Sequence, residues 1–257
     1  MTTAFTLAGS DSGGGAGIQA DLKTFEALGV HGTCVITCVT AQNLKGVFGI
    51  EAVSSRMVRK QMDAVMEGFT PEAAKTGMLY SEDIIKAVVA GFKRHKAIPL
   101  VVDPVMVATS GSPLLRPEAV KVLARKLFPM ATLITPNLDE AGYLTGVHLE
   151  NIEDVRDAAK WLAEKTGVAI LLKGGHLKNS KEALDILRIG SEEWLLTAPF
   201  IRGVKTHGTG CTYSAAIAAG MSRGMNLLEA VVAAKEYITR AIAGSRKVSG
   251  NLVLGSG

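Results

Sequence analysis

The most constraining feature of the sequence is a regular alternation of short, apolar, β-branched runs with longer segments that carry apolar residues at helical spacing. This alternation favours a mainly parallel sheet covered by helices on both faces. We therefore expect a three-layer α/β fold. The predicted strands lie at residues 4–7, 33–39, 47–53, 73–76, 100–103, 132–135 and 169–173, followed by a hairpin of residues 183–189 and 194–198.

Helices are predicted between these strands, and Ser81 and Asn151 are expected to cap two of them. The tail from Gly250 onward is expected to be frayed. No linker, repeat or low-complexity segment interrupts the chain, so we predict one domain over residues 1–257. Further predicted helices cover residues 55–69, 117–127 and 227–245.

The composition excludes several classes of protein. The net charge of +4 is small and no block of consecutive basic residues occurs, so no nucleic-acid surface is indicated. Neither a signal peptide nor a membrane-spanning run is expected. Cys34, Cys38 and Cys211 form an odd set without metal-ligand spacing, which indicates reduced thiols in the cytoplasm. Cys34 and Cys38 are expected to pack in the core from one face of their strand.

A glycine-rich loop over residues 9–17 joins the first predicted strand to a helix. It matches neither common phosphate-binding motif, because Ile18 occupies the last glycine position of the dinucleotide pattern and no Gly-Lys-Ser/Thr occurs in the chain. We expect this loop to approach a ligand closely by another geometry. Asp11 and Asp21 flank it, and each taken alone is expected to cap a turn or a helix.

A second glycine-rich loop, Thr206 to Cys211, runs directly into an alanine-rich segment that is predicted to be helical. Gly208 and Gly210 allow backbone N–H groups to crowd around an anion, and the helix N-terminus adds partial positive charge. We expect the pKa of the Cys211 thiol to be lowered there, so that the thiolate can act as a base. The alternative is a helix N-terminus with a small buried cysteine.

Polar side chains follow several predicted strands, at the edge of the sheet where ligands bind in folds of this kind. Asp103 and Glu140 are hard oxygen ligands suited to Mg²⁺, which takes one or two carboxylates and completes its shell with water and phosphate oxygens. Lys173 precedes two glycines and can bridge phosphates. With the loop at 208–211, these groups can hold a nucleoside triphosphate and position its last phosphate.

Each of these residues also has a structural interpretation when taken alone. Asp103 fits a turn, Glu140 a charge in the first turn of a helix, and Lys173 a solvated strand end. Gln42 is either a loop residue or a bidentate partner for a heterocycle that offers a donor and an acceptor.

Ordered blocks of the chain carry a family resemblance that extends over all but the tail. The blocks are residues 8–24, Lys75-Thr-Gly-Met-Leu79, Val102-Asp-Pro-Val-Met106, Ile134-Thr-Pro-Asn-Leu-Asp-Glu140, Leu172-Lys-Gly-Gly-His176 and Thr206-His-Gly-Thr-Gly-Cys211. They resemble those of the hydroxymethylpyrimidine/phosphomethylpyrimidine kinases, which belong to the ribokinase-like superfamily and act in thiamine biosynthesis. The resemblance implies a ribokinase-like fold, ATP as phosphoryl donor, Mg²⁺ and a homodimer. It also implies phosphorylation of 4-amino-5-hydroxymethyl-2-methylpyrimidine and then of its monophosphate.

The resemblance further implies residue roles. Cys211 matches the catalytic position, and Gly208 and Gly210 match the anion hole. The metal positions are Glu140 and Asp103, and the ATP-binding positions are Lys173, Asn137, Thr206 and Thr209. The residues that line the pyrimidine pocket are Gln42, Gly9, Ala16, Asp21 and Met78.

Two alternatives stay open. Pyridoxal kinases share nearly every block but lack a glutamine at the position of Gln42. A buried amide exchanges two hydrogen bonds with an N–C–NH₂ edge, which pyridoxal does not offer, so Gln42 favours the pyrimidine. The second alternative is a binding module without turnover, and the presence of Cys211, Glu140 and Lys173 argues against it.

Overall fold

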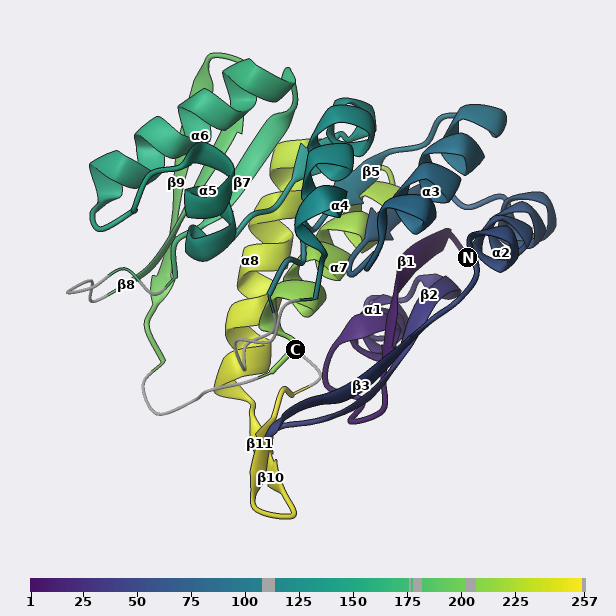
Figure 1. Ribbon diagram of the computed structural model, residues 1–257. Coiled ribbons are helices and arrows are strands. Elements are labelled where there is room, and N and C mark those ends of the chain that lie inside the picture. Colours follow the sequence, from purple (N-terminus) through teal and green to yellow (C-terminus); the bar gives the residue numbers. More distant parts are fainter. Residues whose placement is uncertain (108–113, 176, 178–181, 202–206, 256–257) are drawn as a thin grey trace.

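The computed structural model describes residues 1–107, 114–175, 177, 182–201 and 207–255, and within them nine strands form one sheet in the order β3-β2-β1-β4-β5-β6-β7-β8-β9 (Figure 1). Six neighbouring strands pair in parallel, namely β2, β1, β4, β5, β6 and β7. Strand β3 pairs antiparallel with β2 at one edge, and β8 and β9 form the other edge with antiparallel pairing. The predicted, mainly parallel sheet is thus confirmed. The strands are β1 (Thr3–Asp11), β2 (His31–Asn43), β3 (Gly46–Ala52), β4 (Ala73–Thr76), β5 (Leu100–Val102), β6 (Leu133–Ile134), β7 (Ala169–Lys173), β8 (Glu182–Ile189) and β9 (Glu192–Pro199).

Helices cover both faces of the sheet, and each helical layer shares an apolar cluster with it. Alternate residues of β1 serve the two layers, because Phe5 and Leu7 pack in one cluster and Ala4 in the other. The first layer contains α2 (Ser55–Phe69), α3 (Glu82–Arg94), α4 (Pro117–Val122), α5 (Leu138–Thr145) and α6 (Ile152–Thr166). The second contains α1 (Gly17–Ala27), α7 (Thr209–Ser222) and α8 (Leu227–Ala243).

Helix α7 lies deep in the second layer. Its residues from Thr212 to Ser222 are all buried, and its small side chains let α8 approach closely. A Cβ added at Gly220 would lie 3.1 Å from the Cβ of Ala230. The alanine-rich composition of α7 therefore fixes the position of its N-terminus at the edge of the sheet.

Local sequence signals account for most helix boundaries. Ser81 accepts a hydrogen bond from the N–H of Ile84 at 3.4 Å, and Asn151 accepts one from the N–H of Asp154 at 3.1 Å, as expected for N-caps. The predicted helix at 55–69 matches α2. The helix predicted at 117–127 consists of α4 and a π-helical turn, η1 (Leu123–Leu127), and a short 3₁₀ turn, η2 (Phe128–Met130), follows it.

The prediction of a frayed tail was wrong. Helix α8 ends at Ala243, and β10 (Arg246–Val248) and β11 (Asn251–Val253) form an antiparallel hairpin. Ser249 and Gly250 have φ values of +50° and +82°, which is the backbone of a two-residue hairpin turn. The Ser-Gly pair between alternating residues was the sequence signal for this turn.

The expectation that Cys34 and Cys38 share one face was also wrong. The register between β1 and β2 shifts between Ala8 and Ser10, so β2 contains an extra residue at this point. A bulge of this kind reverses the alternation of faces. Thr37 and Cys38 are consecutive and both buried, whereas Cys34 is only half-buried.

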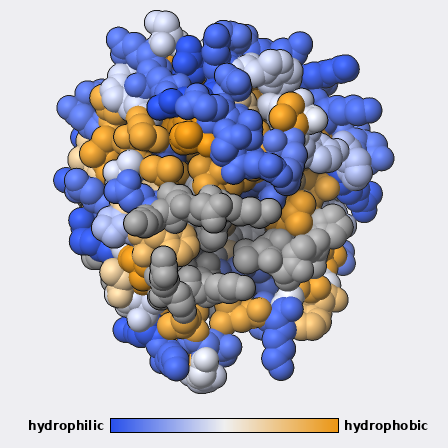
Figure 2. Space-filling view, turned by 90° about the vertical axis from the view of Figure 1, so that its left-hand side faces the viewer, coloured by the Kyte–Doolittle hydropathy of each residue, from blue (hydrophilic) through white to orange (hydrophobic). Residues whose placement is uncertain are grey.

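The surface of the described part gives no sign of a membrane span. No helix within it is both long and apolar enough to cross a bilayer. Figure 2 shows one face of the molecule, on which hydrophilic side chains surround smaller groups of hydrophobic ones.

Candidate active site

The two glycine-rich loops meet at the carboxyl edge of the parallel strands. Gly208, which precedes α7, has a φ of +85°, and a Cβ there would overlap the carbonyl oxygen of Gly15. Only glycine permits both features. The backbone N–H of Gly17 is also near the thiol of Cys211 and acts to lower its pKa. The loop after β1 therefore packs directly against the loop that is predicted to bind an anion.

Asp11 holds the first loop in shape. Its Oδ1 accepts a hydrogen bond from the N–H of Gly13 at 2.8 Å, and its Oδ2 accepts from Gly15 at 3.1 Å and from Ala16 at 2.8 Å. Burial works to raise the pKa of this carboxyl, but His207 and the backbone N–H groups outweigh burial and lower the pKa below its ordinary value. The prediction that Asp11 caps a turn is confirmed.

The N-terminus of α7 faces the charged side chains at the sheet edge. Its N-cap is Gly208, which has no side chain to bond the first-turn N–H groups. Such an end attracts anions. A Cβ added at Gly210 would lie 3.3 Å from Lys173 Nζ and 3.9 Å from Asp103 Oδ2. The structure thus brings the predicted anion hole, Lys173 and Asp103 together.

Asp103 is buried directly after β5. Its Oδ1 accepts hydrogen bonds from Lys173 Nζ at 2.9 Å and from Thr135 Oγ1 at 3.1 Å. Ser214 Oγ of α7 lies 3.2 Å from Oδ2. Burial works to raise the pKa of Asp103, but the charges of Lys173 and Lys75 outweigh it and hold the pKa below its ordinary value. Asp103 is therefore an anion that links β5, β6, β7 and α7.

Asn137 and Glu140 form the capping box of α5. Asn137 Oδ1 accepts a hydrogen bond from the N–H of Glu140 at 2.8 Å, and Glu140 Oε2 accepts from the N–H of Asn137 at 2.9 Å. A β-bridge between Asn137 and Lys173 brings the box beside β7. Burial raises the pKa of Glu140 to about 7, with Asp103 adding to the effect and Lys173 opposing it. The interpretation of Glu140 as a first-turn helix charge is confirmed, and its metal role stays a prediction.

The donor set fits Mg²⁺. Within the described ranges no group of three or more His, Cys, Asp or Glu side chains could hold a metal ion by itself. Mg²⁺ needs fewer, because one or two carboxylates suffice when phosphate oxygens and water complete its shell. Glu140 and Asp103 are such a pair. Their repulsion contributes to the raised pKa of Glu140, and a divalent cation would relieve it.

The expectation of a lowered pKa at Cys211 was wrong. Burial raises the pKa of this thiol to about 11, although Lys75 and the N–H of Gly17 act in the opposite direction. Asp21 and Asp103 add to the increase because they are negative charges near the sulfur. The sequence shows the helix N-terminus but not these two carboxylates, which come from distant segments. Cys211 is a neutral thiol at pH 7.

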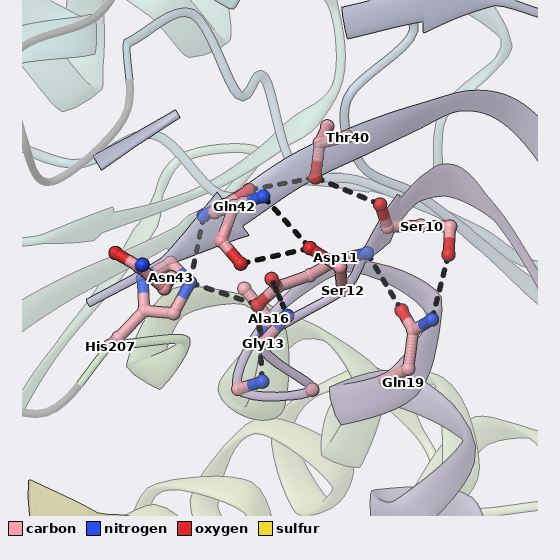
Figure 3. A network of polar contacts seen from close by, with 12 residues as sticks. Ser10, Asp11, Ser12, Gly13, Ala16, Gln19, Thr40, Gln42, Asn43 and His207 are labelled. Atoms are coloured by element: carbon pink, nitrogen blue, oxygen red, sulfur yellow. Dashed lines mark hydrogen bonds and ion pairs between the residues drawn. The ribbon is translucent and has the colours of Figure 1, made fainter. Parts of the chain in front are cut away.

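Several residues predicted to line the pyrimidine pocket lie together beside β1 and β2. A Cβ added at Gly9 would lie 2.8 Å from Cys38 Sγ and 3.4 Å from Met78 Sδ. Ala16 is the N-cap of α1. Gln42 lies near the end of β2, with its side chain 3.0 Å from His207 (Figure 3).

Asp21 lies beneath these residues. It has no exposed surface, and its two carboxylate oxygens each accept a hydrogen bond from Lys75 Nζ at 2.8 Å. Thr6 Oγ1 donates a third hydrogen bond to Asp21 at 2.6 Å. The expectation that Asp21 caps a turn or a helix was wrong, because its oxygens accept from Lys75 and Thr6. Its place in the pyrimidine pocket stays a prediction.

The sequence interpretation missed the partners of two predicted residues. His207 Nε2 lies 3.1 Å from Asp11 Oδ2, although 196 positions separate them in the chain. The only sequence signal for a site role of His207 was its position in the second glycine-rich loop. Lys75 lies in a motif block, but nothing in the sequence pairs it with Asp21. Of the predicted ATP-binding residues, Thr209 begins α7 and Thr206 lies outside the described residues.

The fold and the site together define a ribokinase-like kinase. The comparisons with known proteins agree. The chain matches the family described as phosphomethylpyrimidine kinase over residues 11–253. It is 49% identical to the hydroxymethylpyrimidine/phosphomethylpyrimidine kinase of Rhizobium meliloti, over 95% of this chain and 92% of that protein.

Solved structures agree with this assignment. The phosphomethylpyrimidine kinase of Clostridium difficile superposes with a TM-score of 0.83 at 42% identity, covering 94% of this chain and all of the other. An ADP complex of Bacillus subtilis pyridoxal kinase gives a TM-score of 0.88 at 36% identity, with 99% and 96% of the two chains covered. This chain belongs to the phosphomethylpyrimidine kinase family.

Proposed function

We propose that this protein is an ATP-dependent kinase that phosphorylates 4-amino-5-hydroxymethyl-2-methylpyrimidine and then converts the monophosphate to the diphosphate. The observation that carries the proposal is the convergence of the α7 N-terminus, Lys173, Asp103 and Glu140 at one point of the sheet edge. Gln42 at the end of β2 and His207 in the loop before α7 lie beside it. The first group suits a triphosphate, and Gln42 suits an aminopyrimidine.

In the proposed reaction the hydroxymethyl oxygen attacks the γ-phosphorus of ATP, the bond to the bridging oxygen breaks, and ADP leaves. The N–H groups near Gly208 and Gly210 stabilise the charge of the transferred group, and Lys173 contacts the phosphates. Asn137, Thr206 and Thr209 are the other proposed ATP contacts. Cys211 is the proposed base: the small fraction of thiolate that a pKa of about 11 leaves near neutral pH accepts the proton of the attacking hydroxyl.

Mg²⁺ is proposed to bind at Glu140 and Asp103. When bound, the ion neutralises phosphate charge and orients the triphosphate. The negative charge of Asp103 adds to the effect of burial in raising the pKa of Glu140, and a bound divalent cation would offset that repulsion.

A homodimer in the cytoplasm is the proposed state of the enzyme. In the described part β3 is a free edge of the sheet, and Phe48 on it and Val39 on β2 are exposed apolar residues. Cys34, Cys38 and Cys211 are free thiols, consistent with a reducing compartment. Light scattering of the purified protein measures the oligomeric state, and a monomer at micromolar concentration would contradict the dimer.

A substrate panel tests the activity. Purified protein with Mg·ATP is given the hydroxymethylpyrimidine, its monophosphate or pyridoxal, and ADP release is measured. We expect ADP with both pyrimidines and little with pyridoxal. Efficient turnover of pyridoxal alone would identify a vitamin B6 kinase, and binding of the pyrimidine without ADP would identify a non-catalytic module. Lys173→Ala is the matched control for contaminating kinases, because it should abolish the signal.

A further inference from the structure

The Gln42 side-chain amide lies between two polar groups that the proposed reaction does not use. Gln42 Oε1 lies 3.1 Å from Thr40 Oγ1, and Gln42 Nε2 lies 3.0 Å from His207 Nε2 (Figure 3). The same His207 nitrogen is 3.1 Å from Asp11 Oδ2. The nitrogen and oxygen ends of an amide have nearly the same shape, so the hydrogen-bond partners determine which end faces which neighbour.

The proton on His207 is determined by Asp11. Three backbone N–H groups donate to the Asp11 carboxylate, from Gly13, Gly15 and Ala16. An ionised carboxylate only accepts hydrogen bonds, so the contact at 3.1 Å requires a proton on His207 Nε2. A second donor facing this nitrogen would be repelled. The oxygen, and not the nitrogen drawn there in Figure 3, therefore belongs at the end of the Gln42 amide beside His207.

Thr40 leads to the same orientation. Its hydroxyl has a single proton, and the carbonyl oxygen of Ser10 lies 2.9 Å from Thr40 Oγ1. When Thr40 donates to Ser10, its oxygen can only accept a hydrogen bond from Gln42. The NH₂ group, in exchange for the oxygen drawn there in Figure 3, therefore belongs at the end of the amide beside Thr40. With this assignment the contacts of Gln42 with Thr40 and with His207 each join a donor to an acceptor.

We propose that Thr40 and His207 are positioning residues that hold the Gln42 amide with its NH₂ toward Thr40 and its oxygen toward His207, and so determine the orientation of the bound ring. The proposal rests on the proposed function, because it takes an aminopyrimidine as the ligand.

The orientation has a consequence for catalysis. Along the edge of the ring the ring nitrogen, the amino group and the hydroxymethyl group follow one another. The ring nitrogen accepts from the Gln42 NH₂ on the Thr40 side, and the amino group donates to the Gln42 oxygen on the His207 side. The hydroxymethyl group then lies beyond His207, toward Gly208 and the start of α7. The reverse amide orientation would turn the hydroxymethyl group away from α7.

The test compares the aminopyrimidine with its 4-oxo analogue, in which the ring nitrogen carries a proton and the substituent only accepts. Binding of both compounds is measured by calorimetry, and kcat and KM are measured separately. We expect wild type to prefer the amino compound by about a hundredfold, because the oxo compound mismatches both hydrogen bonds. In Thr40→Val and His207→Phe the amide can rotate, and the preference should fall about tenfold.

Conservative variants and a neighbour serve as controls. Thr40→Ser keeps the hydroxyl and His207→Gln keeps a donor near the Nε2 position, so both should restore most of the preference. Asn43→Ala changes the next residue of β2, whose side chain bonds only the N–H of Lys45 among its described contacts, and should keep the wild-type preference. Thermal unfolding of each variant checks that the fold is intact.

A ligand-free measurement tests the orientation directly. In the labelled protein we expect nuclear Overhauser effects between the Gln42 NH₂ protons and the Thr40 methyl group. Effects to the His207 ring protons alone would overturn the proposal, as would an unchanged preference in both Thr40→Val and His207→Phe. Failure of the proposed function is a separate result, namely no ADP from wild type with either pyrimidine.

Discussion

The Cys211 thiol lies among opposing charges at the start of α7. Lys75 favours its thiolate form, whereas burial, Asp21 and Asp103 favour the thiol, and the thiol prevails because its pKa is about 11. The four groups come from α1, β4, the end of β5 and α7. The proton affinity of the proposed base is thus set by burial and by charged side chains from other segments of the chain.

We expect turnover to rise with pH if Cys211 acts as a base. Below a pKa of about 11 the thiolate fraction grows about tenfold per pH unit, so kcat should increase from pH 7 to 9. Cys211→Ala should reduce kcat by about a hundredfold or more and flatten the profile. ADP release at saturating Mg·ATP gives the measurement. Cys34→Ala is the control and should keep the wild-type profile, and a flat wild-type profile would exclude the thiolate as the base.

Lys75 and Asp21 form a buried ion pair whose two side chains have no exposed surface. We expect Lys75→Met to lower the free energy of unfolding by about 3–5 kcal/mol, because it leaves the Asp21 carboxylate buried and unpaired. Removing both charges in Lys75→Met/Asp21→Asn should cost less than the single change. Urea unfolding measures both variants. The exposed pair of Lys86 and Glu82 is the matched control, and Lys86→Met should leave the free energy of unfolding almost unchanged.

Among the secondary-structure elements, α7 decides the position of the site. Gly208 ends the preceding loop in a left-handed conformation and touches Gly15 across the interface between the two loops. We expect Gly208→Ala to lower turnover by about tenfold or more and to destabilise the fold by more than about 2 kcal/mol, because strain and overlap add.

Gly29→Ala separates these two effects. Gly29 also has a positive φ, +70°, but a Cβ there would have open space around it. The change should cost about 1–2 kcal/mol of stability and leave turnover unaltered. Kinetics and urea unfolding of the pair give the measurement. Equal losses of turnover in the two variants would show that the contact between the loops does not matter for the site.

The sequence predicted elements well where the signal is local. The bounds of α2, β4 and β7 agree with the predicted ranges because apolar spacing and caps define them. The bulge in β2 was not predictable, since it depends on pairing with β1. The raised pKa of Cys211 and the contact of His207 with Asp11 depend likewise on segments that only the folded chain brings together. The hairpin of β10 and β11 was predictable, because the Ser249-Gly250 pair is a local turn signal.

At the scale of the whole protein, an ionised Glu140 suits the proposed metal site but lowers the stability of the fold. Below pH about 4.5 this residue is protonated in both the folded and the unfolded chain. Between about 4.5 and 7 the unfolded chain releases the proton and the folded chain retains it, so the contribution of Glu140 to stability falls as pH rises through this range. The contribution of Asp103 has the opposite sign, because its lowered pKa adds stability that is lost only as pH falls below its ordinary value.

Glu140→Gln should therefore stabilise the ligand-free protein at pH 8, where the burial penalty of the carboxylate is fully present, and leave it almost unchanged at pH 4.5. From the raised pKa we expect Tm to increase by about 3–6 °C at pH 8. The same change should weaken the response to free Mg²⁺, so that turnover requires a higher concentration of the ion. Thermal unfolding at the two pH values and a magnesium titration of ADP release measure both effects. Glu67→Gln, at an exposed position of α2, should alter neither, whereas a Glu140→Gln protein with wild-type Tm at pH 8 and a wild-type magnesium response would show that this carboxylate neither strains the fold nor holds the ion.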